Sequence, residues 1–158
     1  MKILALKTSA LLRRFPESLL LLGSRLFPAA LFWQSGQTKV EGWALNDSAL
    51  YLFQEEYQLP FLDPNLAAHL AAISEHLFPL LLVLGLATRF SALALLGMTL
   101  IIQCLVYPDA WPTHGTWAML FLWLVIRGPG WFSLDHLFVR AMAPIGSKVS
   151  PKRESSGS

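Results

Sequence analysis

A few ionisable side chains lie inside long apolar stretches of this sequence, and they are the residues best placed to do chemistry. From residue 66 to residue 107 the only formal charges are Glu75 and Arg89, and Arg25 interrupts an earlier apolar stretch. At about 1.5 Å per helical residue, Arg25 lies roughly 10 Å from one end of its stretch and Glu75 roughly 13 Å from the opposite end of an antiparallel one. In an apolar layer about 30 Å thick these two heights nearly coincide. The spacing therefore predicts an ion pair between Arg25 and Glu75.

This predicted pair has two interpretations. Because a charge in hydrocarbon costs about 2.5–3.5 kcal/mol on insertion scales, the pair could serve a purpose: it could line a polar cavity, bind an anion or a quinone headgroup, or relay protons. Alternatively, it only fixes the register of two helices, each charge neutralising the other. The sequence leaves both interpretations open.

Three histidines are candidate metal ligands. His69 and His76 are seven residues apart, which places them on one helix face but about 10 Å apart along the axis, too far to share one ion. A metal or haem would need a further ligand such as His114, and no ligand spacing indicates one. Each histidine can equally be a hydrogen-bonded residue between helices.

The elements that hold these residues must be membrane helices. The chain is 54% apolar and only 14% charged, against about 25% charged in soluble domains. This excludes a disordered chain, a nucleic-acid-binding protein and a small soluble enzyme. We predict an all-α fold, a four-transmembrane-helix bundle, with spans at residues 18–36, 66–87, 90–107 and 113–127.

Charge placement predicts the orientation of these spans. Basic residues fall in the segments that share a side with both termini, whereas Lys39 is alone among acidic residues on the other side. Because Lys and Arg stay on the cytoplasmic side, both termini are expected there. Residues 1–17 form a basic cytoplasmic N-terminus, without a cleaved signal because Arg25 breaks the apolar stretch. Residues 139–158 form a cytoplasmic tail, disordered from residue 147.

Two short helices are expected outside the spans. After Asp47, a credible N-cap, apolar residues recur at near-helical spacing as far as Tyr57, which predicts an amphipathic helix at the membrane interface between the first and second spans. Ser133 is expected to cap a second short helix through Phe138 on the cytoplasmic surface.

Several local motifs, in order, resemble one family. They are Arg25-Leu26-Phe27, then Ser35, Gly36 and Lys39 after the first span, Glu75 in the second, Leu84-Gly85-Leu86-Ala87-Thr88-Arg89 between the second and third, and Gly130 followed by Ser133-Leu134-Asp135. Together they resemble the DoxX family of small four-helix membrane proteins, over residues 19–138. The stretch 41–63 departs from that pattern in being longer and more acidic.

The resemblance implies a protein of the bacterial inner membrane. The family's namesake is a subunit of a thiosulfate:quinone oxidoreductase, so the resemblance implies an accessory or scaffold subunit of a redox, sulfur or metal-stress assembly. Such a subunit would hold no catalytic centre of its own and would contact the bilayer and a protein partner. By position, Arg25 and Glu75 would be the intramembrane polar pair, and Lys39, Arg89 and Asp135 would anchor helix ends.

Two alternatives remain open at the level of sequence. The chain could be an oxidoreductase subunit that binds quinone between helices near Arg25 and Glu75. It could instead be a small transporter or channel for a metal or sulfur compound, with His69, His76 and Glu75 along its path.

Overall fold

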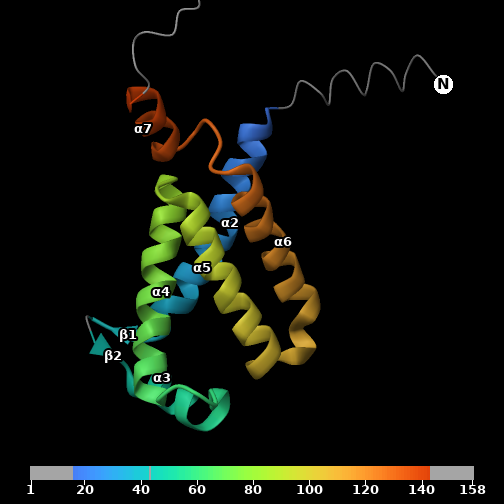
Figure 1. Cartoon of the computed structure of the whole chain (residues 1–158). Coiled ribbons are helices and arrows are strands. Elements are labelled where there is room, and N and C mark those ends of the chain that lie inside the picture. The colour runs from blue at the N-terminus through green and yellow to red at the C-terminus, as the bar shows by residue number, and fades with distance from the viewer. Residues whose placement is uncertain (1–15, 43, 143–158) are drawn as a thin grey trace, which may run out of the picture.

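The fold is built from four long helices that pack side by side (Figure 1). The computed structural model describes residues 16–42 and 44–142. The helices are α2 (Glu17–Gln37), α4 (Pro64–Leu84), α5 (Thr88–Ile101), which continues as the π-helix η2 (Ile102–Val106), and α6 (Trp111–Arg127). The prediction of a mostly helical chain is confirmed. Helix α2 packs mainly on α4, and α5 packs mainly on α6.

Short elements connect the long helices. Between α2 and α4 lie a two-stranded hairpin, β1 (Val40–Glu41) with β2 (Ala44–Leu45), then α3 (Asp47–Tyr51) and the π-helix η1 (Leu52–Tyr57). A 3₁₀ turn, η3 (Pro108–Ala110), precedes α6, and α7 (Leu134–Met142) follows it. The predictions for residues 1–15 and for the tail from residue 147 lie outside the described residues.

The helix predicted between the first two spans is present, and its N-cap lies one residue earlier than expected. Asn46, not Asp47, is the N-cap, and its side chain accepts a hydrogen bond from the Ala49 amide at 2.7 Å. Ala49 and Phe53 are buried, whereas the acidic residues Glu55 and Glu56 of η1 are exposed. Helix α3 and η1 therefore form an amphipathic segment that covers the N-terminal end of α4.

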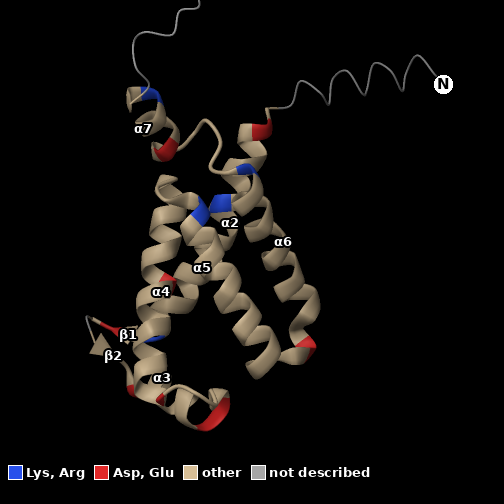
Figure 2. Cartoon of the chain, viewed as in Figure 1, with Lys and Arg blue, Asp and Glu red and all other residues tan. Residues whose placement is uncertain are grey.

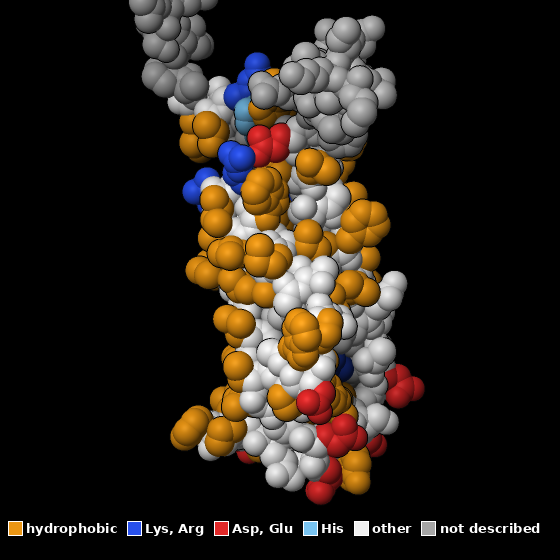
Figure 3. All heavy atoms as spheres, turned by 90° about the vertical axis from the view of Figure 1, so that its right-hand side faces the viewer, with side chains coloured by type: hydrophobic (Ala, Val, Ile, Leu, Met, Phe, Trp, Pro, Cys, Tyr) orange, Lys and Arg blue, Asp and Glu red, His pale blue; other side chains and the backbone are white. Residues whose placement is uncertain are grey.

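Alanines and large apolar residues such as Leu82, Leu95 and Phe121 share the contacts between the helices, and many other large apolar residues face outward. Ala67, Ala68, Ala71 and Ala92 are buried, whereas large apolar side chains cover much of the outer surface (Figure 3). Small residues let helix backbones approach closely where the surroundings are apolar. Two helices, Pro64–Leu84 and Thr88–Val106, are long and apolar enough to cross a membrane.

The charged residues separate toward the two ends of the molecule. In Figure 2 most of the Lys and Arg lie at the end where α2 begins and α6 ends, and most of the Asp and Glu lie at the end that carries α3. Glu17 begins α2 and Asp135 lies in α7, so both are acidic residues near the basic end, whereas Lys39, between α2 and β1, is a basic residue toward the acidic end.

Candidate functional site: a buried ion pair at an apolar cavity

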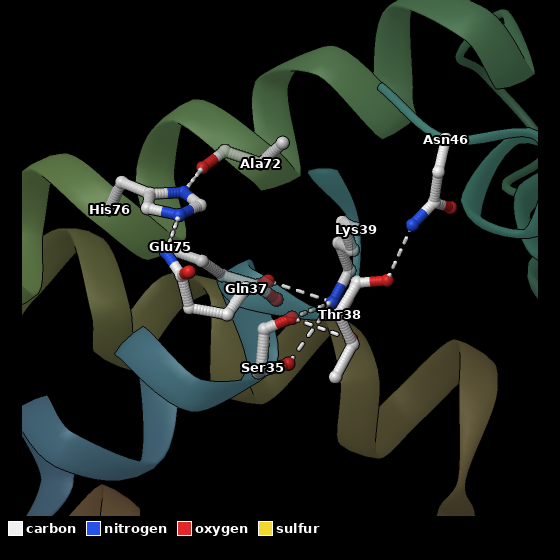
Figure 4. A network of polar contacts seen from close by, with 8 residues as sticks. All are labelled: Ser35, Gln37, Thr38, Lys39, Asn46, Ala72, Glu75 and His76. Carbon is white, nitrogen blue, oxygen red and sulfur yellow. Dashed lines mark hydrogen bonds and ion pairs between the residues drawn. The ribbon is translucent and has the colours of Figure 1, made fainter. Parts of the chain in front are cut away.

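Glu75 forms its ion pair with Lys39. The Lys39 Nζ atom lies 2.7 Å from Glu75 Oε2, and the two side chains are only 7% and 4% exposed. Lys39 follows α2, and its ammonium also donates to the Ser35 hydroxyl at 3.0 Å and the Ser35 carbonyl at 3.3 Å (Figure 4). A buried, hydrogen-bonded ammonium thus neutralises the carboxylate in the middle of α4.

Arg25 does not reach Glu75, so the predicted Arg25–Glu75 pair is wrong. The Arg25 guanidinium is fully buried in the first half of α2, where it donates to the Phe132 carbonyl and lies against Gly85. Gly85 is ten residues beyond Glu75 on the same helix, which corresponds to roughly 15 Å. The two charges therefore lie at different heights in the bundle.

The glycines of α2 and α4 set this register. Gly36 lies directly against His76 and Glu75, because a Cβ atom on Gly36 would be 2.8 Å from His76 and 3.1 Å from the Glu75 Cβ. Gly85, with φ of +66°, lets Arg25 and Ser133 approach in the same way. Counting residues from the ends of apolar stretches cannot locate such contacts, so the sequence estimate aligned the wrong pair.

The Lys39–Glu75 pair forms part of the wall of a cavity of about 560 Å³. Helices α2, α4, α5 and α6 and the segment η1 all contribute to its walls. Most of the lining is aliphatic or aromatic, and the polar lining residues are Ser35, Lys39, Tyr57, Ser74, Glu75, Tyr107 and His114. A mostly apolar cavity with a few convergent polar groups is typical of a small-molecule site.

Two of these polar residues are tyrosines from the connecting segments. The rings of Tyr57 and Tyr107 are edge-to-face with centroids 5.8 Å apart. Burial, with a hydrogen bond to Tyr107, raises the pKa of the Tyr57 hydroxyl well above its ordinary value. Tyr57 is therefore an uncharged hydrogen-bonding group over the physiological pH range.

The three candidate histidines lie apart and make separate hydrogen bonds. His69 bonds to the Asn65 carbonyl at 2.8 Å, and His76 bonds to the Ala72 carbonyl at 2.6 Å and to Gln37 at 2.8 Å. His114, which is buried, donates from its Nδ1 atom to the Gln103 Oε1 atom at 2.8 Å. Across the described residues, no group of three or more His, Cys, Asp or Glu side chains could hold a metal ion.

Asp135 connects the C-terminal segment to the start of α5. Its two carboxylate oxygens accept hydrogen bonds from the amides of Ala87 and Thr88, at 2.8 and 2.9 Å. Asp135 thereby caps a helix that begins almost fifty residues earlier in the chain, and Ser133 accepts from the His136 amide at 3.2 Å at the start of α7. Arg89 lies against Gly128 at the same end.

Comparison with known proteins now adds to this geometry. The sequence profile of DoxX matches residues 20–108, which is more than half of the chain. The chain belongs to the DoxX family. It is also 31% identical over 132 residues to an uncharacterized protein of Haemophilus influenzae, a match that covers 76% of this chain and 82% of that protein. No solved structure matches the chain.

Membership in the DoxX family explains why many large apolar side chains face outward. DoxX is a family of membrane proteins, and the exposed apolar side chains of α4 and α5, such as Leu77 and Phe90, suit contact with lipid. The matched region contains both Lys39 and Glu75 and three of the four long helices that surround the cavity. The fourth wall, α6, lies beyond it.

Proposed function

We propose that this DoxX protein is a four-span accessory subunit of a bacterial inner-membrane assembly with both termini cytoplasmic, and that it binds a quinone headgroup in the cavity beside Lys39 and Glu75. The observation that carries the proposal is a buried ion pair in the wall of an otherwise apolar cavity of about 560 Å³. A quinone has the matching chemistry, since its ring and tail are apolar and its carbonyl oxygens accept hydrogen bonds. The assembly would be one of redox, sulfur or metal-stress metabolism.

Lys39 has the chemistry to recognise a carbonyl oxygen. Two of its three hydrogen bonds are short enough to be strong, whereas the contact with the Ser35 carbonyl is the longest at 3.3 Å. A ligand oxygen could replace that contact and leave the ion pair intact. The hydrogen bond would be charge-assisted and therefore stronger than one between neutral groups.

Glu75 would orient the ammonium and hold its charge in place. Its carboxylate is buried and its ion-pair partner among the described residues is Lys39. The apolar walls, which include Phe53, Phe78 and Trp117, would pack against the ring. The protein in this proposal binds and positions the quinone, and its partner subunit carries the electrons.

The transporter alternative places His69 and His76 along one path with Glu75. Neither His69 nor His76 lines the cavity beside Glu75. His76 instead bonds to Gln37 across the α2–α4 contact, and its ring packs edge-on against Trp33 at 5.0 Å. The geometry therefore favours the quinone-binding alternative.

The test is binding of a short-tailed ubiquinone analogue to the purified full chain in detergent micelles, measured by tryptophan quenching and by calorimetry. We expect saturable binding at one site, weakened about tenfold by Lys39→Met, which removes a charge-assisted hydrogen bond. Glu41→Gln is the control for a one-unit change in net charge close to Lys39 in sequence, because Glu41 is exposed and does not line the cavity.

A steric variant keeps the test decisive if Lys39→Met fails to fold. Gly97 lines the cavity, and no heavy atom would lie within 4 Å of a Cβ atom placed on it. Gly97→Leu would therefore fill the cavity and abolish binding, whereas Gly115→Leu, at an equally open glycine outside the cavity, would not. The proposal is overturned if no saturable binding occurs, or if the two leucine variants bind the analogue equally.

A further inference from the structure

A second cavity, of about 710 Å³, opens at the opposite end of the molecule from the Lys39–Glu75 pair. It lies between the start of α2, the start of α5, the end of α6 and α7. We refer to it as the rim pocket. Its polar lining consists of Glu17, Ser18, Thr88, Arg89, Arg127, Asp135 and His136.

The rim pocket carries charges of both signs in equal number. Two guanidinium groups, Arg89 and Arg127, and two carboxylates, Glu17 and Asp135, line it. Arg127 pairs with Glu17 at 3.2 Å, but both side chains remain about half exposed at 51%. Among the described residues, the hydrogen bond of the Arg89 guanidinium is a long one, at 3.5 Å to the Ile126 carbonyl. The planar guanidinium group of arginine can donate two hydrogen bonds at once to the oxygens of a phosphate.

One buried hydroxyl in the wall has no hydrogen-bond partner within the part of the chain that the structure describes. The Thr88 side chain is fully buried, and its Oγ1 atom bonds to nothing among the described residues. Buried polar groups are nearly always hydrogen-bonded, because an unsatisfied one costs about 1–3 kcal/mol. Thr88 and Arg89 both line the rim pocket, so a ligand oxygen bound there is the candidate partner for this hydroxyl.

The pocket is surrounded by exposed apolar side chains. Trp131 is 75% exposed, and Phe90, Phe132 and Val139 are more than half exposed around it. In a spanning bundle this ring of aromatic and aliphatic residues would lie at the headgroup level, where tryptophan is enriched. Acyl chains would pass along these side chains while a polar headgroup enters the pocket. A water-soluble metabolite would not contact these apolar side chains, so they favour a lipid as the ligand.

We infer that the rim pocket binds the headgroup of a zwitterionic aminophospholipid, with the phosphate on Arg89 and Arg127 and the ammonium toward Glu17. The balance of two cationic and two anionic side chains is what distinguishes this ligand from an anionic lipid. Asp135 already accepts two backbone hydrogen bonds, which leaves Glu17 as the accessible carboxylate. The inference rests on the proposed membrane orientation and is independent of quinone binding, since the two cavities share no lining residue.

The test is native mass spectrometry of the full chain released from detergent, titrated separately with phosphatidylethanolamine, phosphatidylglycerol and inorganic phosphate. We expect one retained phosphatidylethanolamine, and Arg89→Gln should weaken that retention about tenfold through loss of a charge-assisted contact. Arg140→Gln is the matched control, because Arg140 is an exposed arginine at the same end that does not line the pocket.

Thr88→Val separates lipid binding from stability. The substitution removes a hydroxyl that has no partner, so thermal stability should be unchanged or higher while lipid retention falls. Equal retention of phosphatidylglycerol, competition by free phosphate, or an Arg89→Gln effect no larger than that of Arg140→Gln would each overturn the inference. Quinone binding measured on the same variants should be unchanged, so a failure here is distinct from a failure at Lys39 and Glu75.

Discussion

Alanine substitution at three glycines tests how tightly Arg25 is enclosed. Gly85 ends α4 with φ of +66°, and a Cβ atom there would meet the Arg25 guanidinium and lie 2.8 Å from the Ser133 Cα. The positive φ costs an alanine about 1–2 kcal/mol. Overpacking against a neighbour that cannot retreat adds about 1–3 kcal/mol. We therefore expect Gly85→Ala to lower the free energy of unfolding by about 2–5 kcal/mol.

The other two glycines separate these contributions. Gly42 has φ of +62° but no heavy atom within 4 Å of its Cβ position, so Gly42→Ala should cost only the backbone amount of about 1–2 kcal/mol. Gly97 lies inside helix α5 and is also open, so Gly97→Ala should stabilise the protein by about 0.8–1 kcal/mol. The assay is unfolding in mixed micelles, followed by circular dichroism. If Gly85→Ala cost no more than Gly42→Ala, Arg25 and Ser133 would not enclose Gly85.

Three further predictions concern the polar groups. Lys39→Met should lower the free energy of unfolding by about 3–5 kcal/mol in the same assay, because it leaves Glu75 buried without its cation. The double variant with Glu75→Leu should lose far less than the sum of the losses of the two single variants, and additive losses would contradict the pairing. Asp135→Ala should cost about 1–2 kcal/mol and speed hydrogen exchange at the amides of Ala87 and Thr88, and unchanged exchange there would argue against the cap. Burial raises the pKa of Tyr57 in the folded state. Its contribution to stability is therefore complete below the ordinary tyrosine pKa near 10 and is lost as the pH rises toward the pKa of the folded state. Tyr57→Phe should reduce this loss of stability at alkaline pH, which tyrosinate absorbance and unfolding measurements would show.

Local sequence patterns predicted much of the helical organisation. Asp63 and Pro64 mark the start of α4, where Asp63 accepts a hydrogen bond from the Leu66 amide at 3.0 Å, two residues before the predicted boundary. Ser133 caps α7 as its position indicated. These features depend on neighbouring residues alone, so a single sequence contains the information needed to locate them.

The pairing of the buried charges depends on tertiary contacts, so it could not be predicted from local sequence. Arg25 and Glu75 are both buried, but their heights follow from where Gly36 and Gly85 let α2 and α4 touch. Lys39 was expected only to anchor a helix end. The available clue was its position four residues after Ser35, from which a long side chain can turn back into the bundle. The reach of Asp135 to the start of α5 has no counterpart in local sequence.

Photoaffinity mapping with an azidoquinone tests the central claim most directly. The proposal predicts that the label attaches to cavity-lining residues such as Phe53, Met98 or Trp117, and that unlabelled quinone analogue and Gly97→Leu each suppress it. Attachment only at outward-facing positions such as Ile73 and Leu93, without competition by the unlabelled analogue, would contradict the proposal that this cavity binds quinone.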